Sequence, residues 1–379
     1  KVIFQFLIFN FQSISNDPMT INFPRQLAEG AKAAKNVKVS GDFSRVIFCG
    51  LGGSAIPGEI ISTLWLDGFN CYIQRGFGLP HWAGREHLII CTSWSGNTEE
   101  TISSFKAAQE LGIPTAAITK GGELAKTARE HDALLIKLPD DPVPPRLGVG
   151  YMLASLLTLL NNSAIIDFKL PTNIQTKPVV GPRFSSRIGF KTPLIYSSYQ
   201  WRYLAKFWKT NFNEDCKIHS FSNYFPEAAH NELAGFAVPA PSVPAPTLTV
   251  PLPKLNLALP ASPFCPSVPS CQRQAQFRHE GEQGRQFIGN AVGTLKPFPI
   301  ILADPDEDKA DKDILEKFAS FLAAMGIDHE VIKLTGGGRL EKILGNYNLA
   351  VSTSFDLARH LGVDPLDASA IETFKKSRS

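Results

Sequence analysis

The sequence lacks any CxxC pair and any Cys and His spacing typical of a metal site, although its 379 residues include six cysteines. These cysteines are scattered singly, which argues against a disulfide scaffold and a zinc site and indicates a reducing compartment. The sequence also has almost no excess of positive over negative charge. The formal net charge is only +3 and there is no dense Lys/Arg stripe, so no nucleic-acid partner is expected. No apolar run reaches the ~20 residues that a membrane span needs. We therefore expect a soluble, cytoplasmic protein without a membrane partner.

The composition that is present is typical of a globular protein with a substantial core, since 44% of the residues are hydrophobic and 19% are charged. A length of 379 residues predicts two domains, because about 100–200 residues per domain is usual. The segment 1–18 contains an apolar run with one positive charge, so a signal peptide is one reading. Gln5 and Asn10 interrupt this run, and no A-x-A-like cleavage site follows before Met19. We expect residues 1–18 to be a disordered extension.

Short apolar runs alternate with helical patterns along most of the chain. Strands are expected at 45–50, 87–93, 114–119, 133–139, 192–198, 217–222, 298–304 and 329–334. Helices are expected at 56–65, 97–111, 121–130, 150–160, 199–210, 226–234, 308–326 and 338–361. This alternation predicts an α/β fold with mainly parallel sheets covered by helices. We expect a first domain over 19–170, a linker over 171–191 and a second domain over 192–379.

One segment of the second domain does not fit this alternation. Residues 238–270 contain ten prolines and a single charged residue, Lys254. Proline at that density is incompatible with helices and central strands. The polar stretch that follows has no clear period, so we expect residues 238–293 to form a disordered insertion. A role of its PxxP spacings as a ligand for SH3-type domains is an alternative.

Two turns between a strand and a helix are rich in glycine and hydroxyl groups. The sequence "CGLGGSAIPGE" contains Gly52, Gly53 and Ser54, and "SWSGNTEE" contains Ser93, Ser95 and Thr98. Parallel α/β sheets bind ligands beyond the carboxyl ends of their strands. Backbone N–H groups at two helix N-termini, together with these hydroxyls, can hold a phosphate without a lysine. The sequence therefore predicts a phosphate site.

Two other interpretations of these turns are available. The glycines of "GLGGSA" match a weak dinucleotide fingerprint, but the place of its ribose-binding acid falls near "CYIQRG", which offers Arg75 and no carboxylate. The hydroxyls of "SGNT" are also common helix caps. One cap needs one residue, whereas three hydroxyl groups are present, which favours the phosphate site.

With these turns, "PPRLGVGY", "NFNEDCK" and "FPEAAHNELAGF" give the chain a resemblance to the bifunctional phosphoglucose/phosphomannose isomerase family of the sugar isomerase (SIS) fold. The resemblance covers about residues 20–236 and 297–379. It implies two SIS domains, each a flavodoxin-like three-layer sandwich with a mainly parallel sheet. It also implies a homodimer, a phosphosugar substrate, and no metal or other cofactor. The insertion 238–293 departs from the family and follows the histidine motif closely.

The resemblance also implies catalytic roles for four residues. Glu214 matches the family base that moves a proton between C1 and C2, although Asp215 beside it complicates the assignment. His230 matches the histidine that opens the sugar ring from the neighbouring subunit. Arg146 matches the arginine that faces the enediolate. Lys375 matches a lysine brought into the site, with Lys376 as the alternative.

The expected function is metal-independent interconversion of glucose 6-phosphate and mannose 6-phosphate with fructose 6-phosphate through a cis-enediolate. One alternative is a SIS protein that senses a sugar phosphate without turnover. Glu214 and His230 favour the enzyme, because a sensor needs the phosphate cradle but no base. A second alternative, a nicotinamide-dependent dehydrogenase, rests only on the weak glycine match.

Overall fold

The structure of the chain is a computed structural model that describes residues 21–43, 45–64, 70–168, 170, 185–236 and 296–377. The predicted extension 1–18 and the predicted insertion 238–293 lie outside the described residues. Of the predicted linker, residues 171–184 also lie outside them, and 185–188 form a short helix, α6 (Ser185–Ile188). The division into domains at 19–170 and 192–379 stays a prediction.

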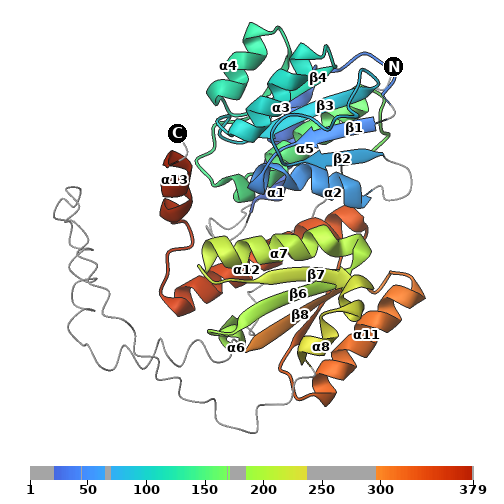
Figure 1. Ribbon diagram of the computed structural model, residues 1–379, viewed down its shortest axis with the longest axis vertical. Coiled ribbons are helices and arrows are strands. Elements are labelled where there is room, and N and C mark those ends of the chain that lie inside the picture. The colour runs from blue at the N-terminus through green and yellow to red at the C-terminus, as the bar shows by residue number, and fades with distance from the viewer. Residues whose placement is uncertain are drawn as a thin grey trace, which may run out of the picture.

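A five-stranded parallel sheet forms the first half of the structure, in the order β2-β1-β3-β4-β5 (Figure 1). Its strands are β1 (Arg45–Cys49), β2 (Cys71–Gln74), β3 (His87–Ser93), β4 (Thr115–Thr119) and β5 (Leu134–Lys137). Four of them confirm the predicted apolar runs. Strand β2 was not predicted, because this edge strand is short and only partly buried and therefore lacks a continuous apolar pattern.

Helices cover both faces of this sheet, which makes the predicted three-layer arrangement. In β1, Val46 and Phe48 face the core shared with α1 (Phe23–Ala34), α2 (Ile56–Leu64) and α5 (Val149–Asn162). Ile47 and Cys49 face the opposite core, under α3 (Glu99–Glu110) and α4 (Gly122–Glu130). Successive residues of a strand point to opposite faces, so a strand buried on both sides is apolar throughout.

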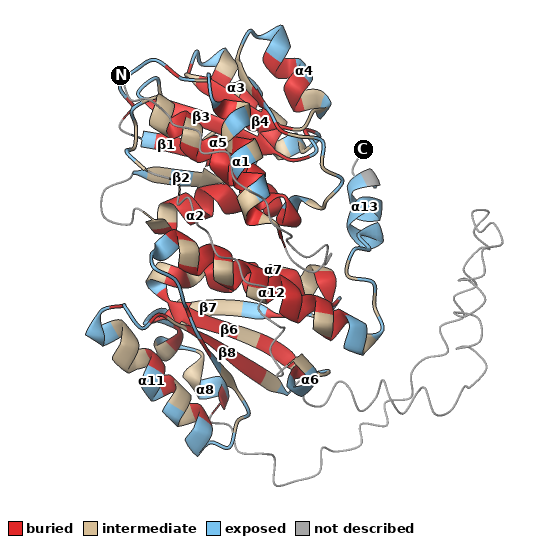
Figure 2. Cartoon of the chain, turned by 180° about the vertical axis from the view of Figure 1, so that it is seen from behind, coloured by how far each residue is buried: buried red, intermediate tan, exposed pale blue. Residues whose placement is uncertain are grey.

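The second half repeats this architecture with four parallel strands in the order β7-β6-β8-β9 (Figure 1). The strands are β6 (Thr192–Ser198), β7 (Phe221–Phe225), β8 (Pro297–Ala303) and β9 (Glu330–Lys333). One core lies under α7 (Arg202–Asp215) and α12 (Arg339–Leu361), and the other lies under α8 (Leu233–Phe236) and α11 (Lys309–Ala324). The final helix, α13 (Ser369–Lys376), is exposed (Figure 2).

The two halves share one hydrophobic core, in which α2, α5, α7 and α12 lie between the two sheets. The buried faces of α7 and α12 are visible in Figure 2. An ion pair crosses the same boundary, because Lys206 on α7 lies 2.6 Å from the buried carboxylate of Glu59 on α2. Glu59 also pairs with Arg75. Burial, followed by the positive charge of Arg75, lowers the pKa of Lys206 to about 8.

Two predicted elements around α7 were wrong in their bounds. The strand expected at 217–222 begins only at Phe221, because the preceding residues stay attached to α7: Ser220 N–H donates to Asn213 Oδ1 (2.8 Å) and its hydroxyl donates to Lys209 O (2.9 Å). The helix expected at 199–210 starts at Arg202 after a 3₁₀ turn, η3 (Tyr199–Trp201), and continues to Asp215. Glu214 therefore lies in the last turn of α7.

The helix expected at 226–234 is also replaced by shorter pieces. They are the 3₁₀ turn η4 (Glu227–His230) and α8, which follow the cis peptide bond between Phe225 and Pro226. Most of the other predicted helices match within a few residues, including the long α12. In the described part of the chain, no helix combines the length and the apolar character needed to cross a bilayer.

Candidate functional site

The two glycine- and hydroxyl-rich turns meet at the carboxyl edge of the first sheet. They follow the neighbouring strands β1 and β3, whose next helices α2 and α3 pass to opposite faces of the sheet. This is the switch point at which open α/β sheets bind ligands. The backbone N–H of Trp94 donates to Ser54 Oγ at 3.0 Å, so the turns are directly bonded to each other.

The hydroxyl groups of these turns differ in what they can offer a ligand. Ser54 Oγ and Ser95 Oγ accept hydrogen bonds from backbone N–H groups, and neither hydroxyl donates a hydrogen bond to another described residue, so both can donate to a ligand. Ser93 Oγ accepts from Gly96 N–H at 3.1 Å and lies 3.0 Å from Thr98 Oγ1. Ser93 therefore shapes the turn, while exposed Ser95 and half-buried Thr98 lie nearer the solvent.

The two glycines of the first turn, Gly52 and Gly53, are required for different physical reasons. Gly52 has φ +51° with open space where a Cβ would point, so this position requires a residue that tolerates the left-handed conformation. Gly53 packs against the next turn of the site, η2 (Pro145–Leu147). A Cβ on Gly53 would lie 2.6 Å from Arg146 N and 2.7 Å from Pro145 C. Only glycine allows the first turn, η1 (Gly52–Ser54), to lie this close to Arg146.

Gly53→Ala is expected to separate η1 from η2, because the atoms that the methyl group would meet belong to backbone and cannot rotate away. We expect a loss of about 1–3 kcal/mol in the free energy of unfolding, measured by urea denaturation. Gly345→Ala is the matched control, since its nearest neighbour would be Thr335 O at 3.9 Å and alanine favours a helix. Equal stability of the two variants would show that η1 and η2 do not pack as described.

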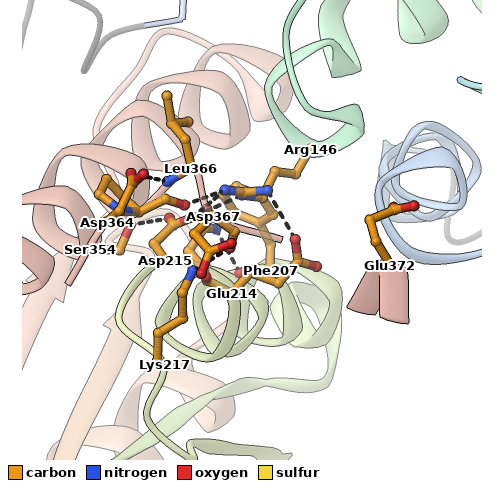
Figure 3. Close-up of polar contacts among 12 residues, drawn as sticks. Arg146, Phe207, Glu214, Asp215, Lys217, Ser354, Asp364, Leu366, Asp367 and Glu372 are labelled. Atoms are coloured by element: carbon orange, nitrogen blue, oxygen red, sulfur yellow. Dashed lines mark hydrogen bonds and ion pairs between the residues drawn. The ribbon is translucent and has the colours of Figure 1, made fainter. Parts of the chain in front are cut away.

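Arg146 connects the turns of the first half to α7 of the second half. Its side chain is 5% exposed, and its Nη1 donates to Glu214 Oε2 at 3.0 Å (Figure 3). Asp215 Oδ1 lies 2.9 Å from Nε and 2.6 Å from Nη2. Tyr347 fixes the backbone of the same residue, because its hydroxyl donates to Arg146 O at 2.7 Å. One guanidinium thus gathers two adjacent carboxylates beside the glycine turn.

The two carboxylates that meet Arg146 have different surroundings. The side chain of Glu214 is 28% exposed, whereas that of Asp215 is fully buried. Burial raises the pKa of Asp215 to about 6, against the opposing effects of Arg146 and of the Ser354 hydroxyl, which donates to Asp215 Oδ2 at 2.6 Å. The partly exposed Glu214 is therefore the carboxylate that a ligand can reach.

The structure brings Arg146, Glu214 and the predicted phosphate turns together, but it places His230 elsewhere. Glu214 lies at the end of α7, before β7 begins, whereas His230 follows the carboxyl end of β7. Helix α7 has 14 residues, so the two ends of this unit are about 20 Å apart at 1.5 Å per residue. His230 is exposed.

Lys375 also lies apart from Arg146 and Glu214. It is on α13, its side chain is 65% exposed, and it pairs with Glu372 at 3.3 Å. Figure 3 shows Glu372 to one side of the cluster around Arg146. The side chain of the alternative, Lys376, lies outside the described residues.

Three residues around Arg146 were not predicted from the sequence or were left without a role: Asp215 and Pro365 contact Arg146, and Ser354 contacts Asp215. Asp215 was noted only as a neighbour of Glu214, and nothing in the sequence indicated Ser354 or the carbonyl of Pro365, which accepts from Arg146 Nη2 at 3.0 Å. These partners are far from Arg146 along the chain, so no local pattern signals them.

Metal-ligating side chains do not gather at this site. Within the described residues, no group of three or more His, Cys, Asp or Glu side chains could hold a metal ion. Four cysteines in the described ranges are free: Cys49, Cys71, Cys91 and Cys216.

The chain is similar in sequence to a described protein family and to several characterised proteins. Residues 183–377 match the family model described as the bacterial phospho-glucose isomerase C-terminal SIS domain. The chain is 34% identical to a bifunctional phosphoglucose/phosphomannose isomerase from Aquifex aeolicus over 205 residues, which cover 52% of this chain and 63% of the relative. It is 31% identical to a protein of the same name from Caldicellulosiruptor bescii, covering 58% of this chain and 71% of that one. The matched part thus spans about two thirds of the length of these relatives.

Solved structures share the fold at much lower identity. A hypothetical protein from Thermus thermophilus has a TM-score of 0.64 at 12% identity, covering 94% of this chain and 88% of that chain. A tagatose-6-phosphate ketose/aldose isomerase from Escherichia coli has a TM-score of 0.56 at 12% identity, covering 94% and 97% of the two chains. These similarities support the arrangement of sheets and helices described above.

Proposed function

The chain belongs to the bifunctional phosphoglucose/phosphomannose isomerase family, and from this premise we propose that it interconverts glucose 6-phosphate and mannose 6-phosphate with fructose 6-phosphate. The observation that carries this proposal is the position of Arg146. Its backbone lies against Gly53 of the phosphate turn, and its side chain bonds to Glu214. A phosphosugar anchored at the turn thus has a carboxylate and a cation within reach of its other end.

The phosphate is held by the two turns at the edge of the first sheet. Backbone N–H groups of Gly52 and Gly53 and the hydroxyls of Ser54, Ser95 and Thr98 supply neutral donors. Ser93 supports the second turn from beneath. Anchoring the non-reacting end of the sugar fixes the distance to the carboxylate, which lowers the entropic part of the barrier.

The proton transfer is assigned to Glu214. Its carboxylate removes the proton from C2 of the open-chain aldose, and the released electron pair forms the C1–C2 double bond of a cis-enediolate. Negative charge develops on the C1 oxygen, where the Arg146 guanidinium stabilises it. Glu214 then returns its proton to C1, while the proton of the C2 hydroxyl passes to the C1 oxygen, so that the C1 oxygen becomes a hydroxyl and the C2 oxygen becomes the ketone of fructose 6-phosphate. Mannose 6-phosphate differs only at C2, so rotation about C2–C3 lets the same base serve both aldoses.

The remaining two residues are assigned to steps outside this transfer. We assign ring opening to His230 of a second copy of the chain, because the described chain separates its own His230 from Glu214 by the length of α7. Lys375 is assigned to the site through movement of the exposed α13. A cytoplasmic location is part of the same proposal, and the free thiols of the described residues support it.

The experiment that tests the function is a coupled assay of fructose 6-phosphate conversion in the presence of EDTA. We expect both aldose phosphates to form at rates that EDTA does not change. Loss of turnover in EDTA would show that a metal takes part. Binding of fructose 6-phosphate without turnover would identify a sugar-phosphate sensor instead.

The assignment of His230 to a neighbouring subunit predicts complementation between inactive variants. Glu214→Gln and His230→Ala are each expected to be inactive as homodimers. In a mixed dimer, one site combines the intact Glu214 with the intact His230. Equal mixing and random exchange should therefore restore about a quarter of wild-type activity. If the mixture stays inactive although mass spectrometry detects mixed dimers, His230 does not act across a subunit interface.

A further inference from the structure

Asp215 holds the buried side of the Arg146 guanidinium. It is the last residue of α7, its side chain is 0% exposed, and its Oδ1 lies 2.9 Å from Nε and 2.6 Å from Nη2. Its second oxygen, Oδ2, accepts from the Ser354 hydroxyl at 2.6 Å. Asp215 is therefore fixed from both sides, by Arg146 and by α12 (Figure 3).

The five N–H donors of Arg146 are divided between two edges. On the edge formed by Nε and Nη2, Asp215 and the Pro365 carbonyl are the acceptors, and Asp215 is held in turn by Ser354. On the other edge, Nη1 donates one hydrogen to Glu214. Its second hydrogen has no acceptor among the described residues. Nη1 is therefore the nitrogen that can exchange partners when a substrate arrives.

We propose that Asp215 is a positioning residue, which holds Arg146 and shares its charge so that Glu214 and the Nη1 edge can act on the substrate. This inference rests on the proposed isomerase function. Without Asp215, Glu214 would be the only carboxylate among the described residues that pairs with the guanidinium. The full attraction of the cation would then hold the base in an ion pair instead of releasing it toward the sugar.

The charge of Asp215 can change within the range of an activity assay, because burial raises its pKa to about 6. Four titratable groups face it. They are Arg146 on η2, Glu214 on α7, Cys216 directly after α7, and Tyr347 on α12. Below its pKa, Asp215 becomes neutral and ceases to share the charge of Arg146. When kcat is plotted against pH, its fall on the acid side, called the acid limb, should therefore follow the titration of Asp215.

Two substitutions are expected to move this acid limb in opposite directions. Asp215→Asn keeps the shape of the side chain but removes the titrating group, so the limb should move to lower pH while kcat falls about 10- to 100-fold and KM stays within about threefold. Ser354→Ala removes a hydrogen bond that stabilises the charged carboxylate. It should raise the pKa of Asp215 and move the limb to higher pH by up to about one unit.

Asp364→Asn is the matched control for Asp215→Asn. Asp364 is exposed, accepts from Leu366 N–H at 2.9 Å in the same loop as Pro365, and does not contact Arg146. This variant should retain the wild-type profile. A shifted limb in Asp364→Asn would overturn the proposal, because the loss of a negative charge that does not contact Arg146 would then have the same effect as the loss of Asp215.

The remaining outcomes are also decisive. If Asp215→Asn and Ser354→Ala lower activity at every pH without moving the limb, Asp215 has only a structural role. If Asp215→Asn does not fold, Ser354→Ala tests the proposal alone, since it leaves the charge in place. An inactive wild-type chain would refute the proposed function itself, whereas an active wild type with unmoved limbs refutes only the role of Asp215.

Discussion

Glu214→Gln is expected to lower kcat by about 10²- to 10⁴-fold while KM stays within about threefold. The amide keeps the size of the side chain and can still accept a hydrogen bond from Arg146 Nη1, but it cannot take up a proton from C2. The fold should survive, because Arg146 retains Asp215 and the Pro365 carbonyl as acceptors. Steady-state kinetics with fructose 6-phosphate, together with a thermal melt, measures both properties.

The control for this prediction is Glu316→Gln, the same chemical change on the exposed face of α11. It should leave kcat and KM unchanged. Wild-type turnover in Glu214→Gln would remove the proposed base, and Asp215, the other carboxylate at Arg146, would then be the candidate. Loss of folding in Glu214→Gln would mean that its ion pair with Arg146 is structural.

Arg146→Met is expected to lower the free energy of unfolding by about 3–5 kcal/mol near pH 8. The substitution keeps an unbranched apolar chain but leaves Asp215 fully buried without a counter-ion. A buried carboxylate without a partner is much less stable than one that accepts from a guanidinium. Arg146→Met/Asp215→Asn should recover most of the loss, since it removes the buried charge. Urea denaturation of the wild type and both variants measures these differences.

The pH dependence of the same experiment has a definite sign. In Arg146→Met, the pKa of Asp215 should rise above the value of about 6 that it has in the wild type. The folded variant then binds a proton more tightly than the unfolded chain, so its free energy of unfolding falls as the pH rises through that range. The difference from the wild type should therefore be smaller near pH 5 than near pH 8. A pH-independent difference would contradict this account.

Arg187→Met provides the matched control on the surface. Arg187 pairs with Asp328 and with Glu330 (2.8 Å), but its side chain is 43% exposed. Ion pairs in contact with water contribute about 0–1 kcal/mol, so this variant should lose little stability. Equal destabilisation by Arg187→Met and Arg146→Met would show that the burial of the Arg146 cluster has no energetic consequence.

The elements of the first sheet could be predicted well because their signals are local. Strand β3 is buried over its whole length and appears in the sequence as one apolar run, which needs no knowledge of its neighbours. The edge strand β2 lacked that signal because its residues are only partly buried. At β7, tertiary contacts overrode the pattern, since Ser220 bonds to α7 and delays the strand to Phe221.

The candidate site was predictable only in part. Its locally encoded turns could be predicted, whereas its contacts between distant residues could not. The phosphate turns are contiguous stretches whose glycines and hydroxyls can be recognised one at a time. The roles of Arg146, Glu214, His230 and Lys375 came from resemblance to a family. No pattern in the sequence indicated that Asp215 and Pro365 would hold Arg146, or that His230 would lie far from Glu214 within one chain.

By itself, the sequence determined where buried strands run and where a phosphate turn is possible, because hydrophobic period, glycine conformation and hydroxyl placement act over a few residues. Only the tertiary structure decided which carboxylate meets Arg146. Its partners Glu214, Asp215 and Pro365 lie 68, 69 and 219 positions away along the chain. Such contacts arise when α7 and α12 pack between the two sheets, and that packing depends on many apolar side chains together. No short stretch of sequence encodes them.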